Sequence, residues 1–196
     1  MFIKDGLYII ITIILLLLII VLLPIYIIII LGVLCLLYLL SIFYIPKINA
    51  SPFPKTFLAP ANGKITSINE KILGDKTYNE VTITLNFFKS HINVIPMSGK
   101  VENISATCDV NKSNKIESTT EIVTEFGTYC IKQISSGFIN KLVNNLNKNV
   151  PVEIDQFFGY VIFHGQLILY IPDNFEVVAM TNDKVSAGID VIARLK

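Results

Sequence analysis

The hydrophobic and polar positions divide the chain into a long apolar segment and a region of short alternating runs. No charged side chain occurs from Leu7 to Ile45, and this run is too long for one span, because about 20 residues cross the apolar core of a bilayer. Pro24 lies near its middle, where it would kink or end a helix. We therefore predict an apolar helical hairpin over residues 1–46, with helices at about Leu7–Leu23 and Ile25–Ile45. A re-entrant hairpin stays open, because the first helix is short for a span.

Three lysines flank this segment, Lys4 before it and Lys47 and Lys55 after it. A hairpin places both of its ends on one side of the membrane, and basic residues favour the cytoplasmic side. Asp5 and the length of the apolar run argue against a cleaved signal peptide. The sequence thus predicts a membrane-anchored protein whose remaining domain lies on the cytoplasmic face.

Prolines mark residues 47–60 as a non-helical connector. Residues 61–196 then contain short runs rich in β-branched and aromatic residues, which predict strands. These runs are Lys64–Ile68, Val81–Phe87, Lys100–Ile104, Ile122–Phe126, Tyr129–Ile134, Tyr160–Phe163 and Leu167–Ile171. Mixed helical spacing occurs only around Gly137–Leu146, where the asparagines weaken the prediction of a helix.

Two short patterns recur in the β-rich region. Residues Pro60–Ile68 match Pro96–Ile104 at identical spacing, and Asn147–Asp155 match Asn182–Asp190. Each pattern combines a turn with the start of a strand. Paired turn-and-strand units predict a mainly β domain, a hybrid of sandwich and barrel with approximate twofold internal symmetry.

Composition narrows the class of protein further. The net charge is +1 and only 16% of residues are charged, so nothing predicts a nucleic-acid partner. Cys35, Cys108 and Cys130 are widely spaced and form no CxxC motif. This pattern argues against a disulfide framework or a zinc site and fits a reducing compartment.

The stretch Gly159–Pro172 is the centre of the predicted domain. Two apolar runs flank His164, Gly165 and Gln166, and the glycine permits a bend or a close approach to the backbone. A plain hairpin or kinked strand is one interpretation, and an internal cleavage and cofactor site is the other.

Several motifs, in this order, resemble those of the phosphatidylserine decarboxylases, the short membrane-anchored type that depends on a pyruvoyl group. Ala59–Ile65 resembles the family's Ser-Pro-Ala-Asp-Gly-Lys-Val, and the end of Phe87–Val101 resembles its His-Val-Asn-Arg-x-Pro-x-Ser-Gly-Lys-Val. The other matching segments are Phe43–Pro46, Gln133–Ile134 and Phe158–Pro172. The resemblance covers most of the chain.

This resemblance implies a specific chemistry. In the family, a serine attacks the carbonyl of the preceding glycine, the chain is cleaved, and the new N-terminus becomes a pyruvoyl group. That group forms a Schiff base with the amine of phosphatidylserine and serves as the electron sink for decarboxylation to phosphatidylethanolamine. An aspartate and a histidine activate the serine, as a base and an orienting group do beside a weak nucleophile.

Carried over residue by residue, the family's catalytic set is incomplete here. His91 stands at the histidine position, Asn62 at the aspartate position, and Gly165 and Gln166 at the cleaved Gly-Ser bond. An amide at Asn62 cannot carry the negative charge that orients an imidazole, and Gln166 has no hydroxyl with which to attack Gly165. We expect no self-processing and no pyruvoyl group in this chain.

The other candidate residues do not change this expectation. Ser135 and Ser136 fall at the family's Gln-Ile-Ala-Gly turn, far in sequence from the cleavage bend, and His164 cannot supply the carbon skeleton of a pyruvoyl group. His164 is predicted to be a polar residue at the end of a strand. For His91, hydrogen bonding in a cavity and binding of a lipid headgroup are both open.

Three hypotheses about function follow. The first is a decarboxylase homologue that no longer self-processes and that binds a membrane phospholipid, phosphatidylserine above all, or pairs as a homo-oligomer or with an active homologue. The second is an active phosphatidylserine decarboxylase with unrecognised processing. The third is a membrane adaptor whose β domain resembles biotinyl or lipoyl carrier domains, although the chain lacks the Met-Lys-Met of a working carrier.

Overall fold

The computed structural model describes residues 4–43, 55–85, 91–109, 115–136, 141–162 and 165–196. The chain divides into two compact units, Met1–Ile42 and Phe43–Lys196. Of the described elements, the helix belongs to the first unit and the strands to the second.

The apolar segment forms one helix, α1 (Lys4–Phe43), with Pro24 inside it. The predicted helical hairpin, spanning or re-entrant, is therefore wrong. A proline inside a helix costs about 3 kcal/mol, mainly through a lost hydrogen bond and a steric clash. A turn in an apolar surrounding would leave several backbone groups without partners. The residues around Pro24 include no Gly, Asn, Asp or Ser to build such a turn, so the continuous helix is the better solution.

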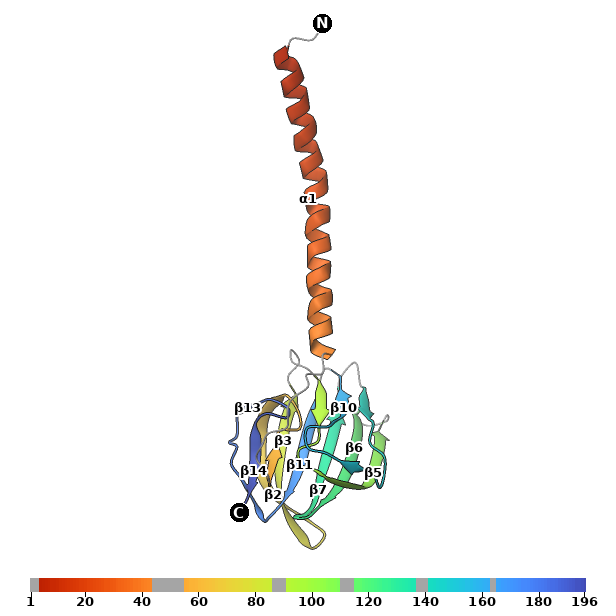
Figure 1. Ribbon diagram of the computed structural model, residues 1–196, viewed down its shortest axis with the longest axis vertical. Helices are drawn as coiled ribbons and strands as arrows, with labels where there is room; N and C mark the ends of the chain where they lie inside the picture. Colours follow the sequence, from red (N-terminus) through yellow and green to blue (C-terminus); the bar gives the residue numbers. More distant parts are fainter. Residues whose placement is uncertain (1–3, 44–54, 86–90, 110–114, 137–140, 163–164) are drawn as a thin grey trace. The chain divides into compact units, whose positions relative to one another are not determined.

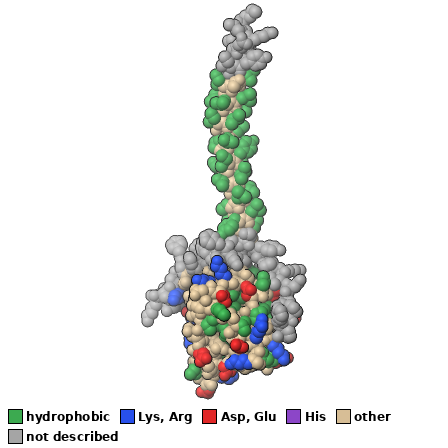
Figure 2. Space-filling model, turned by 90° about the vertical axis from the view of Figure 1, so that its left-hand side faces the viewer, with side chains coloured by type: hydrophobic (Ala, Val, Ile, Leu, Met, Phe, Trp, Pro, Cys, Tyr) green, Lys and Arg blue, Asp and Glu red, His purple; other side chains and the backbone are tan. Residues whose placement is uncertain are grey.

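The middle of α1 is long and apolar enough to cross a membrane. The candidate span is Ile11–Leu40, with a mean hydropathy of 3.6, and its side chains are exposed in the structure. Figure 2 shows hydrophobic side chains along this helix and a mixture of Lys, Arg, Asp and Glu on the face of the β domain in view. The span measures about 45 Å at about 1.5 Å per residue, so a bilayer would accommodate it with tilt or local thickening.

Eight of the described strands form the largest sheet. They are β2 (Gly63–Leu73), β3 (Lys76–Leu85), β5 (Gly99–Asp109), β6 (Lys115–Thr124), β7 (Gly127–Ser135), β9 (Pro151–Val152), β11 (Gly165–Pro172) and β13 (Lys184–Val185). The sheet is antiparallel, in the order β13-β2-β3-β11-β7-β6-β5-β9, and it curls into a half-barrel (Figure 1).

Two three-stranded sheets complete the described part of the domain. One has the order β1-β14-β12, and the other has the order β4-β10-β8. The bounds are β1 (Thr56–Leu58), β4 (Ile92–Val94), β8 (Leu142–Asn144), β10 (Phe157–Val161), β12 (Phe175–Val177) and β14 (Val191–Leu195). The prediction of a mainly β domain is confirmed, and every run predicted as a strand overlaps an observed one.

Two local predictions need correction. The helical spacing near residues 141–146 does not give a helix, because Leu142–Asn144 is strand β8 and pairs with β10. The predicted connector ends earlier than residue 60, because β1 lies inside it and Phe57 is fully buried in the core.

The strand order shows the quasi-twofold symmetry directly. The eight-stranded sheet reads the same from both edges when β13, β2, β3 and β11 are matched with β9, β5, β6 and β7. The two small sheets match in the same way, β1-β14-β12 with β4-β10-β8. The second half, β4 to β10, is therefore inserted in the chain between β3 and β11 of the first half.

The first sequence repeat marks this symmetry correctly. Gly63 begins β2 and Gly99 begins β5, and each strand has an irregularity three residues later, at Thr66 and Glu102. A Cβ on either glycine would collide with a carbonyl oxygen, that of Thr84 or Val123. Glycine is thus required at both positions by close backbone approach.

The second sequence repeat is real, but its predicted register is shifted by two residues. The structural counterpart of Asn182 is Asn149 rather than Asn147. Both have a positive φ, 80° and 67°, and their backbone N–H groups donate to the equivalent carbonyls of Ile65 and Val101 at 2.8 Å. The asparagine-rich sequence offers several alignments, and only the hydrogen bonds select this one.

The core lies between the large sheet and the two small sheets. Its largest members include Phe57, Tyr129 and Phe175, which are fully buried. The ring of Phe57 meets the edges of the other two rings at centroid distances of 5.0 and 4.8 Å. The Tyr129 hydroxyl donates to the Met97 carbonyl at 2.6 Å, which satisfies its one buried polar group.

We expect Gly63→Ala and Gly99→Ala to destabilise the domain equally, by about 1–3 kcal/mol each, because the added methyl group overpacks against backbone. Chemical denaturation of the full chain in detergent measures the change. Gly74→Asn is the control, because Gly74 has φ +61° and open space around it, and asparagine tolerates that conformation. A stable Gly99→Ala variant would contradict the close approach.

Candidate functional site

The structure brings His91 and Gly165 to the two sides of one residue, Val161. The Val161 N–H donates to the His91 carbonyl at 3.4 Å. A Cβ built on Gly165 would lie 2.5 Å from Cγ1 of Val161. His91 precedes β4 and Gly165 begins β11, so residues far apart in sequence meet at this end of the domain.

Asn62 lies in a turn that runs beside β4. Ala61 forms an isolated bridge with Asn93, and the Val94 N–H donates to the Pro60 carbonyl at 2.8 Å. The Asn62 Oδ1 atom accepts a hydrogen bond from the Ala187 N–H at 3.1 Å. The predicted site residues Asn62 and His91 therefore belong to neighbouring segments.

The counterpart of Asn62 in the second half is Ser98, which has the same task. The Ser98 Oγ atom accepts from the Ile154 N–H at 2.8 Å, as Asn62 accepts from Ala187. Asn62 thus fixes the loop after β13 to the turn before β2. The sequence repeat already aligned Asn62 with Ser98 and could have indicated this structural role.

His91 is buried, with 6% of its surface exposed. Burial lowers the pKa of its imidazole below the usual value, because desolvation disfavours the charged form. A neutral imidazole donates one hydrogen bond and accepts one. His91 is suited to hydrogen bonding and does not supply a positive charge for a phosphate.

Gly165 and Gln166 occupy opposite faces of β11. Gly165 is buried, and a Cβ there would lie 2.5 Å from the Ile134 carbonyl oxygen. Gln166 is exposed and pairs through its backbone with Thr84 and Ile134. Because glutamine has no hydroxyl, residue 166 does not fit the precursor of a pyruvoyl group.

Sequence reasoning missed Ser135 as a neighbour of this site. Strand pairing places Ser135 directly opposite Gly165, across β7 and β11. Ser135 is far from Gly165 along the sequence, and no sequence pattern shows which strands become neighbours. Its hydroxyl belongs to another residue, so a reaction there would not turn residue 166 into a pyruvoyl group.

The same end of the domain holds further buried polar side chains that the sequence did not single out. Asn93 and Gln133 are 0% and 1% exposed, and the Gln133 Nε2 atom donates to the Asn93 Oδ1 atom at 2.9 Å. Both residues lie within the quoted motifs. The sequence signal that could have identified them is the presence of a polar residue within an otherwise apolar strand.

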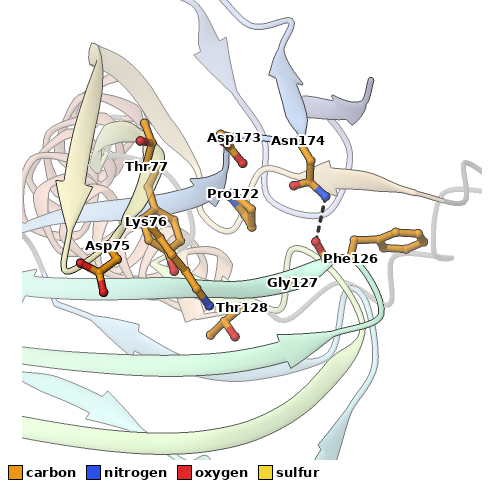
Figure 3. Close-up of a pocket in the computed structure, with 10 residues that line it drawn as sticks. Asp75, Lys76, Thr77, Phe126, Gly127, Thr128, Pro172, Asp173 and Asn174 are labelled. Carbon is orange, nitrogen blue, oxygen red and sulfur yellow. Dashed lines mark hydrogen bonds between the residues drawn. The ribbon is translucent and has the colours of Figure 1, made fainter.

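A pocket of about 460 Å³ lies at the other end of the strands. It is lined by the turns around Asp75, Gly127 and Asp173, and Figure 3 shows the Lys76 side chain extending toward Thr128. Gly127 begins β7 and Ser135 ends it, so roughly 26 Å separates the pocket from the Gly165 end at about 3.3 Å per residue. It contains none of the predicted site residues.

Among the residues that the structure describes, the remaining candidate groups give no alternative chemistry. No cluster of three or more His, Cys, Asp or Glu side chains among the described residues could hold a metal ion. Burial raises the pKa of the Cys130 thiol to about 11, so it is a poor nucleophile at neutral pH. His164 lies outside the described residues.

These features define a class of β protein that has an N-terminal helix long and apolar enough to cross a membrane, and in which a buried histidine and the glycine of a Gly-Gln pair both contact Val161. The family model described as phosphatidylserine decarboxylase matches residues 43–193. The chain belongs to the phosphatidylserine decarboxylase family.

Three relatives carry the name phosphatidylserine decarboxylase proenzyme. The protein of Pelodictyon phaeoclathratiforme is 29% identical over 172 residues, which cover 82% of this chain and 81% of the relative. That of Porphyromonas gingivalis is 29% identical over 81% of this chain and 79% of its own length. That of Wolbachia pipientis wMel is 27% identical over 84% and 80%. No solved structure matches the chain significantly.

We expect Asn62→Ala to lower the free energy of unfolding by about 1 kcal/mol through the lost hydrogen bond. Ser98→Ala, the matched variant in the other half, should cost about the same. Asn62→Asp keeps the acceptor oxygen and should stay within about 0.5 kcal/mol of the native chain. Denaturation curves give all three values, and a harmless Asn62→Ala beside a costly Ser98→Ala would refute the proposed equivalence.

The buried His91 also predicts a pH dependence of stability. The unfolded chain protonates this residue near pH 6.5, whereas the folded chain protonates it only at lower pH. The unfolded state then binds more protons, so the free energy of unfolding should fall as the pH drops below about 6.5, down to the lowered pKa. Denaturation curves across this range measure the slope.

A His91→Gln variant should lose this slope. The comparison is best made in a His164→Gln background, because the chain has only two histidines. Burial also raises the pKa of Asp155, but this effect is common to both chains and cancels in the comparison. An unchanged slope in His91→Gln would contradict the assignment.

Proposed function

We propose that this chain is a member of the phosphatidylserine decarboxylase family that does not convert itself to the pyruvoyl form. It acts in phosphatidylethanolamine metabolism as a protein that binds a membrane phospholipid, phosphatidylserine in the first place, beside His91 and Gly165. It works alone, as a homo-oligomer, or paired with an active homologue.

The main support for the proposed loss of self-processing is the glutamine at position 166. The family's cleavage requires a hydroxyl at this position, and the side-chain amide of glutamine is a hydrogen-bonding group without useful nucleophilicity. Asn62 supports the same conclusion, because its oxygen is occupied by the Ala187 N–H and it has no negative charge. Gln166 therefore cannot serve as the nucleophile, and Asn62 cannot supply the charge that orients the histidine.

Retained lipid binding is supported by what surrounds the lost nucleophile. The frame that holds His91, Val161 and Gly165 together is complete. Apolar helix α1 would keep the β domain close to a lipid surface. A buried neutral histidine beside polar side chains is a reasonable contact for a polar headgroup.

The orientation of the anchor follows from charge. With one helix instead of a hairpin, Lys4 lies at the opposite end of the span from Lys47 and Lys55. Asp5 offsets Lys4, so the excess of basic side chains lies after the helix. Positive residues favour the cytoplasm, and we place the β domain on the cytoplasmic side.

An active decarboxylase with other processing is the second candidate, and the family match over residues 43–193 favours it. Intact mass under denaturing conditions separates the two. We expect one species of 21.9 kDa for the native chain and for Gln166→Ala. Cleavage of either chain would overturn the proposal, because neither has a hydroxyl at position 166.

Restoring the family residues tests the framework. We expect the double variant Gln166→Ser, Asn62→Asp to split after Gly165 into two fragments, the second beginning at residue 166. Gln166→Ser alone should split more slowly, by up to several powers of ten, because an amide does not orient an imidazole as a carboxylate does. The same mass measurement, taken over time, gives both rates.

A further inference from the structure

Six polar side chains, here called the polar cluster, lie on the inner face of the second half of the domain. They are Asn93, Ser118, Thr120, Gln133, Ser135 and Asn144. Five of them are at most 2% exposed, and Asn144 is half-buried. Buried polar groups lower stability unless they are hydrogen-bonded, so this cluster requires an explanation.

Some polar atoms of the cluster form hydrogen bonds with one another or with nearby backbone. The Asn144 Nδ2 atom donates to the Ser118 Oγ and Thr120 Oγ1 atoms at 3.1 and 2.9 Å. The Asn93 Nδ2 atom donates to the Ile92 carbonyl at 3.3 Å, and the Asn93 Oδ1 atom accepts from Gln133. This network turns the Gln133 Oε1 atom away from Asn93.

Two atoms of the cluster are left without a hydrogen-bond partner among the described residues. They are the Gln133 Oε1 and Ser135 Oγ atoms, and both are buried. Gln133 and Ser135 point to the same face of β7. They lie at the end of this strand, where Ser135 pairs with Gly165 of β11. An unsatisfied buried acceptor lowers stability, because it has lost its hydrogen bonds to water.

The first half of the domain is an internal control for this cost. The strand registers match Asn93 with Phe57, Thr120 with Val81, Gln133 with Ile171 and Asn144 with Val177. All four counterparts are apolar, and Phe57, Val81 and Ile171 are fully buried. At these four positions the same backbone frame folds with apolar side chains, so the fold does not require polarity there.

The two unpartnered oxygens, Gln133 Oε1 and Ser135 Oγ, define which chemical group could bind to the cluster. An amide oxygen only accepts hydrogen bonds, and a serine hydroxyl accepts as well as donates. The cluster contains no charged side chain that could hold a phosphate, and its unpartnered Gln133 Oε1 atom cannot donate to one. The group that fits is a hydrogen-bond donor such as a primary amine, whether in a lipid headgroup or in a free amino alcohol.

We propose that the Gln133 Oε1 and Ser135 Oγ atoms receive the amino group of a phospholipid headgroup next to Gly165. This inference rests on the proposed function and adds to it the contact residues and the chemical selectivity. The membrane anchor favours a lipid over a free amine, because lipid is concentrated at the surface where the chain resides.

Titration of the full chain in detergent with short-chain lipids, followed by native mass spectrometry, tests this inference. The native chain should bind phosphatidylserine and phosphatidylethanolamine at least about tenfold more tightly than phosphatidylcholine, whose quaternary ammonium has no N–H donor. Gln133→Leu should lose this preference. Ser135→Ala should weaken it. Because the Ser135 hydroxyl has no hydrogen-bond partner among the described residues, this variant should fold if Gln133→Leu does not.

Thr120→Val is the matched control. It also removes a buried polar group from the inner face, but that group is already bonded to Asn144, and its counterpart Val81 shows that valine fits the frame. We expect Thr120→Val to keep the native lipid preference. Loss of the preference in this variant would overturn the assignment to Gln133 and Ser135.

The other outcomes separate this inference from the proposed function. If the native chain prefers amine lipids and both Gln133→Leu and Ser135→Ala keep that preference, lipid binding stands and the cluster holds ordered water only. If the native chain binds none of the lipids, both proposals fall. Free ethanolamine binding as tightly as the lipid would overturn the assignment to a headgroup.

Discussion

The antiparallel pairing of β11 with β7 is the contact on which the β domain depends. The second half lies between β3 and β11 in the chain, so β11 closes the sheet by pairing with β3 on one side and β7 on the other. Leu167, Leu169 and Ile131 on this pair are buried in the core. The pair also ends at Gly165 and Ser135, so the strand contact that joins the two halves positions the candidate site as well.

The two halves share a backbone and differ in what they bury. Both halves contain a strand bulge and an asparagine with positive φ. In both, a side-chain oxygen, that of Asn62 or Ser98, accepts a hydrogen bond from a backbone N–H group. The first half fills its inner face with Phe57, Val81 and Ile171, whereas the second half places polar side chains there. Since one frame accepts both, we attribute the polar side chains to binding and the repeated features to folding.

Much of the fold could be predicted from sequence because its signals are local. Glycine and proline spacing marked the first repeat, and β-branched runs marked the strands. The errors arose where non-local energies decide. The cost of opening the helix at Pro24 depends on the absence of turn residues around it, and the true counterpart of Asn182 depends on hydrogen bonds to β2 and β5. Motifs found Asn62, His91 and Gly165, but only strand register reveals that Ser135 faces Gly165.

The two positions that differ from the family motifs preserve the fold and, under the proposed function, remove reactivity, which explains how both can coexist with an intact domain. Residue 166 contributes its backbone to the β3 and β7 ladders and exposes its side chain, so the fold accepts any residue that suits an exposed strand position. Asn62 keeps the oxygen that holds the Ala187 N–H, which an aspartate would hold equally well. Selection for folding alone would retain the frame around His91 in a chain without the nucleophile, whereas it gives no reason to keep the buried oxygens of Gln133 and Ser135, which have no partner among the described residues. Those two residues are where a remaining function is to be sought.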